Sequence, residues 1–421
     1  MGRVKVPRPE ISSIRDAGTA SRSIPVEASS LGGSMEQAGG RSAPREAGDL
    51  RLASFRVTIP LAQDGARRFP AGAGSTCSPA IGWHRFSELQ RRSVAAANRG
   101  GGLSTGASGS GPVNGDCGED AMRDSVKAQF EVLDERFRSC GGDGWMDRLH
   151  TGCRWTEGPA YFPAGRYLLF SDIPNDQILR WDETTSAVGV FRHPAGYANG
   201  HTIDRQGRLV SCEQGGRRIT RTEHDGSVTV LADSWDGKRL NSPNDIIERA
   251  DGSLWFTDPS YGIDSDYEGH RADSEIGACH VYRLDQATGA LQVIADDFER
   301  PNGLAFSADE RQLYISDSRR KHIRVFAVTG ASAINSGEVF ATCDAGTFDG
   351  IRLDTSGRIW AAAADGLHCF DPDGTLIGKL HVPEVVANFT FGGAKRNHLF
   401  ICASSSLYSI LVNFNGARYP R

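Results

Sequence analysis

Four polar residues occupy the same position in a repeated sequence unit: Glu157, Asn244, Asn302 and Asp349. Each stands at the start of a short apolar stretch. Two carboxylates and two amide oxygens form a hard-oxygen shell, which suits Ca²⁺ and tolerates Mg²⁺ or Mn²⁺. The sequence therefore predicts one divalent cation held by these four side chains. Ca²⁺ is the expected ion, with Zn²⁺, Mn²⁺ and Mg²⁺ as alternatives.

A purely structural explanation competes with this one at each position. Asn or Asp before Gly readily forms an Asx-turn, and for any single residue of the set that explanation suffices. It does not account for Glu157, because Glu is a poor turn residue and here stands between Trp155 and the pair Gly158-Pro159. The set as a whole therefore favours a site.

The repeat itself predicts the fold. Its units open at Glu157, Asn199, Asn244, Asn302 and Asp349, separated by 42, 45, 58 and 47 residues. Spacings near 45 are typical of β-propeller blades, and each opener is followed by turn and strand signals that fit a four-stranded meander. A last unit from Asn388 to Val412 would take its outer strand from the chain before Glu157. We expect an all-β, six-bladed propeller, with five or seven blades as alternatives.

In a propeller the innermost strands begin at one mouth of the central channel, so residues at this register converge on the axis. Asn199 is then a candidate substrate contact. His201 faces the same side of its strand as Asn199, either toward the channel or as a packed core residue. Asp258 and Tyr261 end a strand and either contact substrate hydroxyls or cap a turn. Four tryptophans are expected to pack between blades: Trp155, Trp181, Trp255 and Trp360.

Composition separates the first 121 residues from the rest. Residues 1–121 carry 15 basic and 11 acidic side chains, no Tyr and a long Gly/Ser run, whereas residues 122–421 have a net charge of −9. The sequence predicts a disordered extension over 1–121, or a start placed too early with Met122 as the initiator, followed by a propeller domain over 122–421. The basic residues are dispersed among acidic ones, which argues against a nucleic-acid partner.

Other classes of protein are excluded by simple counts. Nothing approaches a membrane span. The nine cysteines form no Cys-x-x-Cys pair, so we expect reduced cysteines packed in strands and a cytoplasmic protein. After Met122, apolar residues at helical spacing predict a short lead-in helix or an outer strand at the propeller edge. The sequence does not indicate an oligomeric state.

Several segments, taken in order, resemble the senescence-marker-protein, gluconolactonase and luciferin-regenerating-enzyme family from about Phe130 to Val412. They are Arg154-Trp-Thr-Glu-Gly-Pro, Leu168-Leu-Phe-Ser-Asp-Ile-Pro, Ser242-Pro-Asn-Asp, Leu254-Trp-Phe-Thr-Asp-Pro-Ser-Tyr-Gly, Arg300-Pro-Asn-Gly-Leu-Ala-Phe-Ser, Tyr314-Ile-Ser-Asp-Ser, Phe348-Asp-Gly-Ile and Thr390-Phe-Gly-Gly. The motifs are most similar to the bacterial gluconolactonase branch. The resemblance implies a six-bladed propeller that hydrolyses a small sugar lactone.

The resemblance also implies roles for individual residues. Glu157, Asn302 and Asp349 match the core metal ligands, and Asn244 matches a position that binds the metal directly or holds a metal-bound water or substrate. Asp349 matches the residue proposed to activate water. Where regucalcin-like members have an Arg that contacts the sugar, this chain has Ser242.

Alternatives for the base and for the function remain open. Metal ligation lowers the pKa of a carboxylate and weakens it as a base, so His201, Asp245 and Asp258 stay candidates beside Asp349. A phosphoester or organophosphate hydrolase could use the same oxygen shell. A non-catalytic calcium-binding propeller is the third function class.

Overall fold

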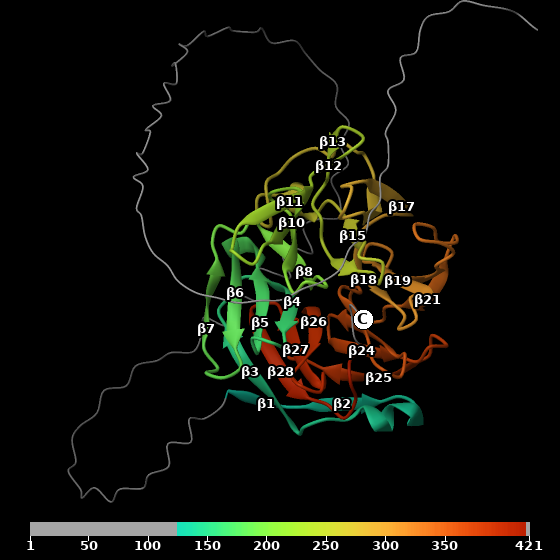
Figure 1. The fold of residues 1–421 in the computed structure, drawn as a ribbon. Helices are drawn as coiled ribbons and strands as arrows, with labels where there is room; N and C mark the ends of the chain where they lie inside the picture. The colour runs from blue at the N-terminus through green and yellow to red at the C-terminus, as the bar shows by residue number, and fades with distance from the viewer. Residues whose placement is uncertain (1–123, 418–421) are drawn as a thin grey trace, which may run out of the picture. The chain divides into compact units, whose positions relative to one another are not determined.

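The structure is a computed structural model that describes residues 124–417. Its strands form six antiparallel sheets of four or five strands arranged around one axis (Figure 1) and one separate two-stranded hairpin, so the predicted all-β, six-bladed propeller is confirmed. The extension predicted for residues 1–121 lies outside the described residues. No helix among residues 124–417 is long and apolar enough to cross a membrane.

Four blades are meanders of four consecutive strands, with the innermost strand first. Blade 1 contains β4 (Thr156–Phe162), β5 (Tyr167–Asp172), β6 (Gln177–Asp182) and β7 (Val188–Arg192). Blade 2 contains β8 (Ala198–Ile203), β9 (Leu209–Glu213), β10 (Arg218–Thr222) and β11 (Val228–Ala232). Blade 3 contains β14 (Ile246–Glu248), β15 (Leu254–Asp258), β16 (Cys279–Leu284) and β17 (Leu291–Phe298). Blade 4 contains β18 (Pro301–Phe306), β19 (Gln312–Asp317), β20 (His322–Ala327) and β21 (Glu338–Thr342).

Blades 5 and 6 are each completed by the segment that precedes blade 1. Blade 5 contains β22 (Ile351–Leu353), β23 (Ile359–Ala363), β24 (Gly366–Phe370) and β25 (Leu376–His381), with β2 (Gln129–Val132) added at its outer edge. Blade 6 contains β26 (Val386–Gly392), β27 (His398–Ala403) and β28 (Ser406–Leu411), followed outward by β3 (Trp145–Thr151) and β1 (Ser125–Lys127). In Figure 1, β1 lies outside β3 at the edge of blade 6, and β2 lies outside β25 at the edge of blade 5.

The lead-in segment is therefore mainly outer strand. Of the two predicted alternatives, a short helix or an outer strand, the strand is the main one. Its helical part is a single 3-10 helix, η1 (Glu135–Cys140), which begins after Asp134 and buries Phe137 and Cys140. The other short elements connect strands: η2 (Ile173–Asn175), the hairpin β12 (Ser234–Trp235) and β13 (Lys238–Arg239), and the helical turn α2 (Tyr261–Asp264).

Predicted turn chemistry ends the strands where expected. In the turn between β10 and β11, Asp225 Oδ1 accepts the amide of Ser227 at 2.9 Å, and Gly226 has φ +85°. That left-handed conformation is strained for residues with a Cβ atom, so the Asp-Gly pair fixes the hairpin position.

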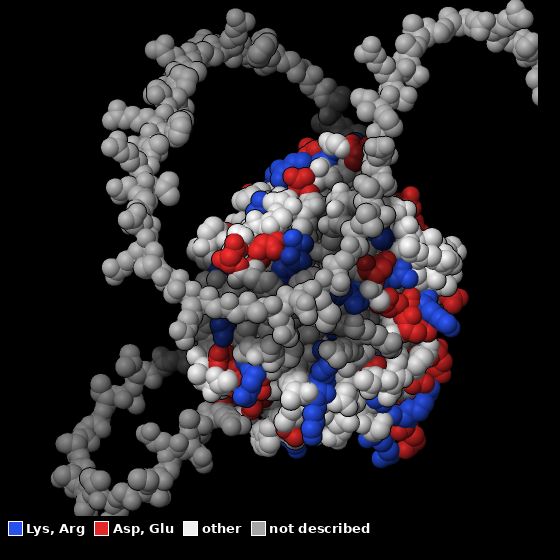
Figure 2. All heavy atoms as spheres, in the orientation of Figure 1, with Lys and Arg blue, Asp and Glu red and all other residues white. Residues whose placement is uncertain are grey.

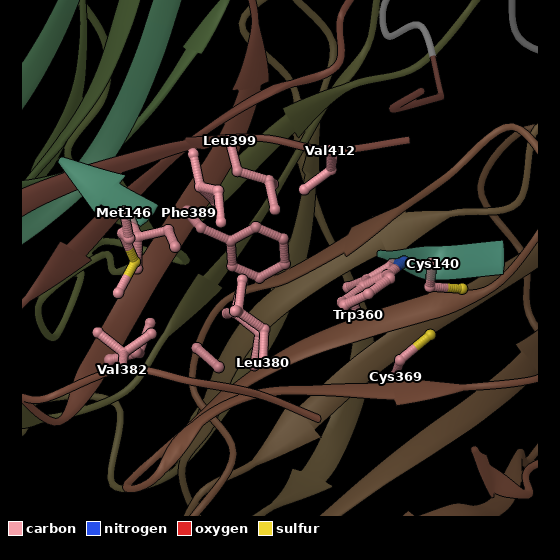
Figure 3. Close-up of a cluster of buried hydrophobic side chains, with 14 of the residues drawn as sticks. Cys140, Met146, Trp360, Cys369, Leu380, Val382, Phe389, Leu399 and Val412 are labelled. Carbon is pink, nitrogen blue, oxygen red and sulfur yellow. The ribbon is translucent and has the colours of Figure 1, made fainter. Parts of the chain in front are cut away.

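The core lies between neighbouring sheets and consists of aromatic and aliphatic side chains with several buried cysteines. Three buried tryptophans pack against a ring from an adjacent unit: Trp181 with Phe400 at 5.1 Å, Trp255 with Phe306 at 5.2 Å and Trp360 with Phe414 at 4.6 Å between centroids. Figure 3 shows the cluster around Trp360 and Phe389, where blades 5 and 6 meet the lead-in segment. The expected inter-blade packing does not hold for Trp155, which is half-buried and joins none of the core clusters of the described residues.

The surface carries charges of both signs. On the face drawn in Figure 2, basic and acidic side chains of the described residues alternate without a broad area of one sign. A phosphate-binding footprint would need clustered Lys and Arg. This face does not offer one.

Candidate functional site

The openers form a ring in blade order around one end of the channel. Glu157, Asn199 and Asn302 are each the second residue of an innermost strand, and Asn244 and Asp349 come two residues before theirs. Blades 1, 3 and 4 each hold the opener carbonyl of the next blade by a hydroxyl on the second strand. Ser171 Oγ donates to Asn199 O at 2.9 Å, Thr257 Oγ1 to Asn302 O at 2.8 Å and Ser316 Oγ to Asp349 O at 2.9 Å. The convergence expected from the repeat is thus present in the main chain.

The residue that follows an opener has to be glycine where the next opener packs against its backbone. A Cβ atom on Gly158 would stand 2.0 Å from Asn199 O, and a Cβ on Gly303 would stand 2.4 Å from Asp349 O. Gly158 also has φ +54°. Contacts this short exclude any side chain, so the glycines set the distance between blades at the ring.

An aspartate at the end of the second strand fixes the turn before each of three openers. Asp258 accepts the amides of Asn241 and Ser242 at 2.8 Å each, through Oδ2 and Oδ1. Asp172 and Asp317 accept the corresponding amides before Glu157 and Asn302. Both oxygens of Asp258 are therefore engaged by backbone, and Asp258 takes the turn-capping alternative instead of contacting substrate or acting as the base.

Three side-chain oxygens of the ring are buried without a hydrogen-bond partner among the described residues: Asn199 Oδ1, Asn302 Oδ1 and Asp349 Oδ1. Asn302 Nδ2 donates to Ser318 Oγ at 3.0 Å, which fixes the amide and leaves its oxygen unpaired. Unpaired buried oxygens are costly unless a ligand satisfies them. The donor set therefore fits a divalent cation that prefers oxygen. No three His, Cys, Asp or Glu side chains within residues 124–417 form a metal cluster, in keeping with a shell that has only two carboxylates.

Electrostatics at the ring favour an added positive charge. Burial raises the pKa of Glu157 from 4.5 to about 8, with the charge of Asp245 acting in the same direction and the amide of Gly158 opposing. Burial also holds the pKa of Asp349 well above its usual value, and the charges of Glu157, Asp245 and Glu268 add to the effect. The two ring carboxylates thus resist being charged together, and a bound cation would relieve this repulsion.

Asp245 lies just behind the ring in a buried ion pair. Its Oδ2 is 3.3 Å from Arg352 Nη1, and its Oδ1 accepts the amide of Ile246 at 2.9 Å. Arg352 lines a cavity of about 100 Å³ that runs between the innermost strands. The Asp245 carboxylate adds negative charge next to the ring. Because both of its oxygens have partners, it is not a free base.

His201 has both ring nitrogens engaged by serine hydroxyls. Nε2 is 2.8 Å from Ser171 Oγ, and Nδ1 is 2.8 Å from Ser211 Oγ. Burial lowers the pKa of His201 to about 3, so the ring is neutral. Because Ser171 Oγ donates its only proton to Asn199 O, it can only accept a hydrogen bond from His201. The neutral His201 ring therefore carries its proton on Nε2. The packed-residue alternative fits, and His201 supports the ring from behind.

Tyr261 is brought to the ring by α2. Arg300 stacks on the Tyr261 ring at 5.1 Å and donates to Asp264 Oδ2 at 2.6 Å. Burial raises the pKa of the Tyr261 hydroxyl, and hydrogen bonds with Ser318 and Asn302 act in the opposite direction. The hydroxyl is thus a protonated donor next to Asn302 and within the field of Asp349.

The Ser242 hydroxyl forms hydrogen bonds with two backbone groups. Its Oγ donates to Pro259 O at 2.6 Å and accepts the amide of Gly262 at 2.9 Å. The hydroxyl thus ties the turn before Asn244 to the loop that carries Tyr261. Regucalcin-like proteins have a sugar-contacting Arg at this position. In this chain, Ser242 organises the main chain there instead.

Two further residues belong to the site and were not singled out from the sequence. Asn388, the sixth opener, is buried and forms a hydrogen bond that lowers the pKa of Glu157. The repeat already marked its position. Glu268 lies in the loop after α2, where burial raises its pKa to about 7, and its charge raises the pKa of both ring carboxylates. Only the long spacing of 58 residues hinted at this insertion.

Comparison with known proteins gives consistent matches. Residues 155–405 match the family profile described as SMP-30/Gluconolactonase/LRE-like region. The gluconolactonase of Zymomonas mobilis is 31% identical over 291 residues, covering 63% of this chain and 80% of that protein. The pentonolactonase XacC of Haloferax volcanii is 28% identical over 265 residues, covering 60% and 82%. The solved gluconolactonase of Xanthomonas campestris is 36% identical with a TM-score of 0.65, covering 69% and 96%.

Proposed function

This chain belongs to the SMP-30/Gluconolactonase/LRE-like family, and on that premise we propose that it hydrolyses a small sugar lactone at the opener ring. The observation that carries the proposal is the set of unpaired buried oxygens of Asn199, Asn302 and Asp349 beside Glu157. The relatives named gluconolactonase and pentonolactonase support the substrate class.

We assign the cation to Glu157, Asn244, Asn302 and Asp349, with Ca²⁺ as the preferred ion. When bound, a divalent cation supplies positive charge that polarises a carbonyl oxygen and stabilises a developing oxyanion. The orphaned oxygens and the carboxylate repulsion described above support this assignment. Asn199 Oδ1 faces the same ring and is assigned to a substrate hydroxyl.

Asp349 is assigned as the group that takes a proton from the attacking water. Its Oδ1 has no partner among the described residues, so it is available to accept this proton. His201, Asp245 and Asp258 are each held by other groups in the protein. As water adds to the carbonyl carbon, Asp349 receives its proton. The ring C–O bond then breaks, and the same proton passes to the departing alkoxide.

Tyr261 is assigned to orient the substrate. Its hydroxyl is protonated at neutral pH, and burial raises its pKa further, so it can donate a hydrogen bond to a lactone oxygen. The Arg300 contact on its ring keeps the side chain in place. Replacing Tyr261 by Phe should therefore raise KM more than it lowers kcat.

The test is hydrolysis of glucono-δ-lactone by the full chain, followed by proton release in weak buffer and corrected for spontaneous ring opening. We expect EDTA to remove turnover, Ca²⁺, Mn²⁺ or Zn²⁺ to restore it, and Asp349→Asn to lack it while still binding the ion. Glu248→Gln is the matched control, because Glu248 is a buried carboxylate on innermost strand β14 that contacts Gln286 and Arg205 instead of the ring. No turnover by folded, ion-loaded protein would refute the gluconolactone assignment. Activity on a phosphoester, or ion binding without any activity, would then identify the other two function classes.

A further inference from the structure

Two cysteines from distant parts of the chain are in contact away from the ring. Cys140 ends η1 in the lead-in segment, and Cys369 lies in β24 of blade 5. Both are fully buried, and their sulfurs lie next to each other beside Trp360 (Figure 3). The Cys369 thiol donates a hydrogen bond to the Cys140 sulfur. The described cysteines are all free thiols.

An arginine side chain contacts one cysteine of this pair. Arg358 Nη1 donates to Cys140 Sγ at 2.8 Å, while Arg358 Nε is held by Asp354 Oδ2 at 2.6 Å. The hydrogen bond from Cys369 and the Arg358 charge lower the pKa of Cys140, against the effect of burial. Burial instead holds the pKa of Cys369 well above its usual value. The two thiols are therefore unequal, one suited to attack as a thiolate and the other to follow as a thiol.

The remaining described cysteines lack this arrangement. Burial raises the pKa of four of them with no arginine in hydrogen-bond contact: Cys153, Cys212, Cys343 and Cys402. A thiol in such a site reacts slowly, because only the thiolate is nucleophilic.

We propose that Cys140 and Cys369 are a built disulfide-forming site that takes a peroxide as its oxidant. The Cys140 thiolate attacks one peroxide oxygen, the O–O bond breaks, and hydroxide leaves, giving a sulfenic acid. The Cys369 thiol then attacks the Cys140 sulfur, the S–S bond forms, and water leaves with the Cys369 proton. The two sulfurs together lose two electrons, which reduce one peroxide to water and hydroxide.

Access requires only a local opening at the propeller edge. The segment before η1 is held on β25 by the amides of Leu133 and Asp134, which donate to Ile377 O at 3.0 and 2.9 Å. Val132 and Leu133 are 46% and 49% exposed, so the main apolar anchor of this segment is the buried side chain of Phe137, which the opening must lift from the core. Short surface segments of this kind open without global unfolding.

Once formed, the bond joins the lead-in segment to blade 5. The closed loop includes blades 1 to 4 and the first strands of blade 5, and cross-links that close long loops restrict the unfolded chain most. The oxidised propeller should therefore resist opening at the seam where β2 adds to β25. The opener ring is not part of this cluster, so the bond is expected to change stability and leave turnover unaffected.

The experiment treats the reduced full chain with hydrogen peroxide, quenches it with a thiol-blocking reagent and maps peptides without reduction. We expect one cross-linked peptide joining Cys140 to Cys369, with a mass lower by two hydrogens. The oxidised protein should show a rise in Tm of roughly 5 °C, reversed by dithiothreitol. Cys369→Ser should abolish both changes, while Cys343→Ser, a buried cysteine outside the pair, should keep both.

Three results would overturn the proposal. One is a peroxide-treated protein in which Cys140 and Cys369 are both still blocked as free thiols. Another is oxidation of Cys140 to sulfinic acid without a cross-link in native protein. The third is a cross-link that joins either residue to a different cysteine. Because peptide mapping is done on the unsubstituted protein, none of these results depends on a variant that must fold.

Discussion

Replacing Gly158 by Ala tests whether the opener ring is held together by the close approach of neighbouring blades. The added Cβ would lie 2.0 Å from Asn199 O, at a position with φ +54°. The left-handed conformation costs an L-residue roughly 1–2 kcal/mol. Overpacking at a rigid contact adds about 1–3 kcal/mol. We therefore expect a loss of roughly 2–5 kcal/mol in the free energy of unfolding.

Two matched variants separate these contributions. Gly226 also has a positive φ, +85°, but nothing lies within 4 Å of its added Cβ, so Gly226→Ala should show the conformational cost alone. Gly303 has no positive φ, and its Cβ would stand 2.4 Å from Asp349 O, so Gly303→Ala should show the packing cost alone. Urea unfolding at constant Ca²⁺ concentration measures all three.

The ring geometry adds a second readout. If Gly158 sets the spacing between Glu157 and Asn199, its substitution should also weaken Ca²⁺ binding measured by calorimetry, whereas Gly226→Ala should leave binding unchanged. A Gly158→Ala protein as stable as Gly226→Ala, with the same Ca²⁺ affinity, would refute the reasoning.

Three shorter predictions concern the charges and caps around the ring. Burial raises the folded-state pKa of Glu157 above the value of 4.5 expected in the unfolded chain, so the folded state binds the extra proton and metal-free protein should lose stability as the pH rises above 4.5. Urea unfolding at several pH values should show that Glu157→Gln, or excess Ca²⁺, removes the slope; an equal slope in the variant would contradict the assignment. Arg352→Met removes the cation that pairs with Asp245, so the Asp245 charge should raise the pKa of the ring carboxylates more strongly and move the acid limb of the activity profile upward. An unchanged profile would mean that Arg352 does not tune the ring. Asp258→Ala strips the acceptor from two buried amides and should cost about 2–4 kcal/mol in thermal unfolding; a loss below 1 kcal/mol would show that the cap is dispensable.

The sequence was enough to predict the ring because a propeller repeats one unit around one axis. The register of Glu157, Asn199, Asn244, Asn302 and Asp349 carries over directly into space once the period is recognised. The same logic placed the outer strand of the last unit in the chain before Glu157. These features depend on spacing alone, and spacing can be read directly from the sequence.

The roles of individual side chains depended on partners that spacing does not reveal. His201 had two plausible roles until Ser171 and Ser211 were found on its two nitrogens. Asp245 looked available as a base, but its partner Arg352 is 107 residues away in the chain. For Asp258 a signal did exist, because Asp172 and Asp317 follow Ser at the ends of β5 and β19 as Asp258 follows Thr at the end of β15.

The loop after α2 was beyond prediction for a different reason. It is an insertion in the third unit, so no other unit offers a segment to align with it. Tyr261 was identified from its position after a strand, but the charge of Glu268 on the ring arises from how the loop folds back. Its backbone contacts, such as the His270 amide donating to Gly262 O at 2.9 Å, have no counterpart in the repeat pattern of the sequence.

The seam of blade 6 constrains the order in which the molecule can form. Thr151 in β3 pairs with Ser406 in β28, so the sheet draws on residues from opposite ends of the described chain. During synthesis β3 leaves the ribosome after its neighbour β1, but its other edge has to wait until β28 has been made. Pairings this distant in sequence slow folding, because the loop between them must close before the contact is gained. The propeller therefore becomes a closed ring only after its sixth blade has been made.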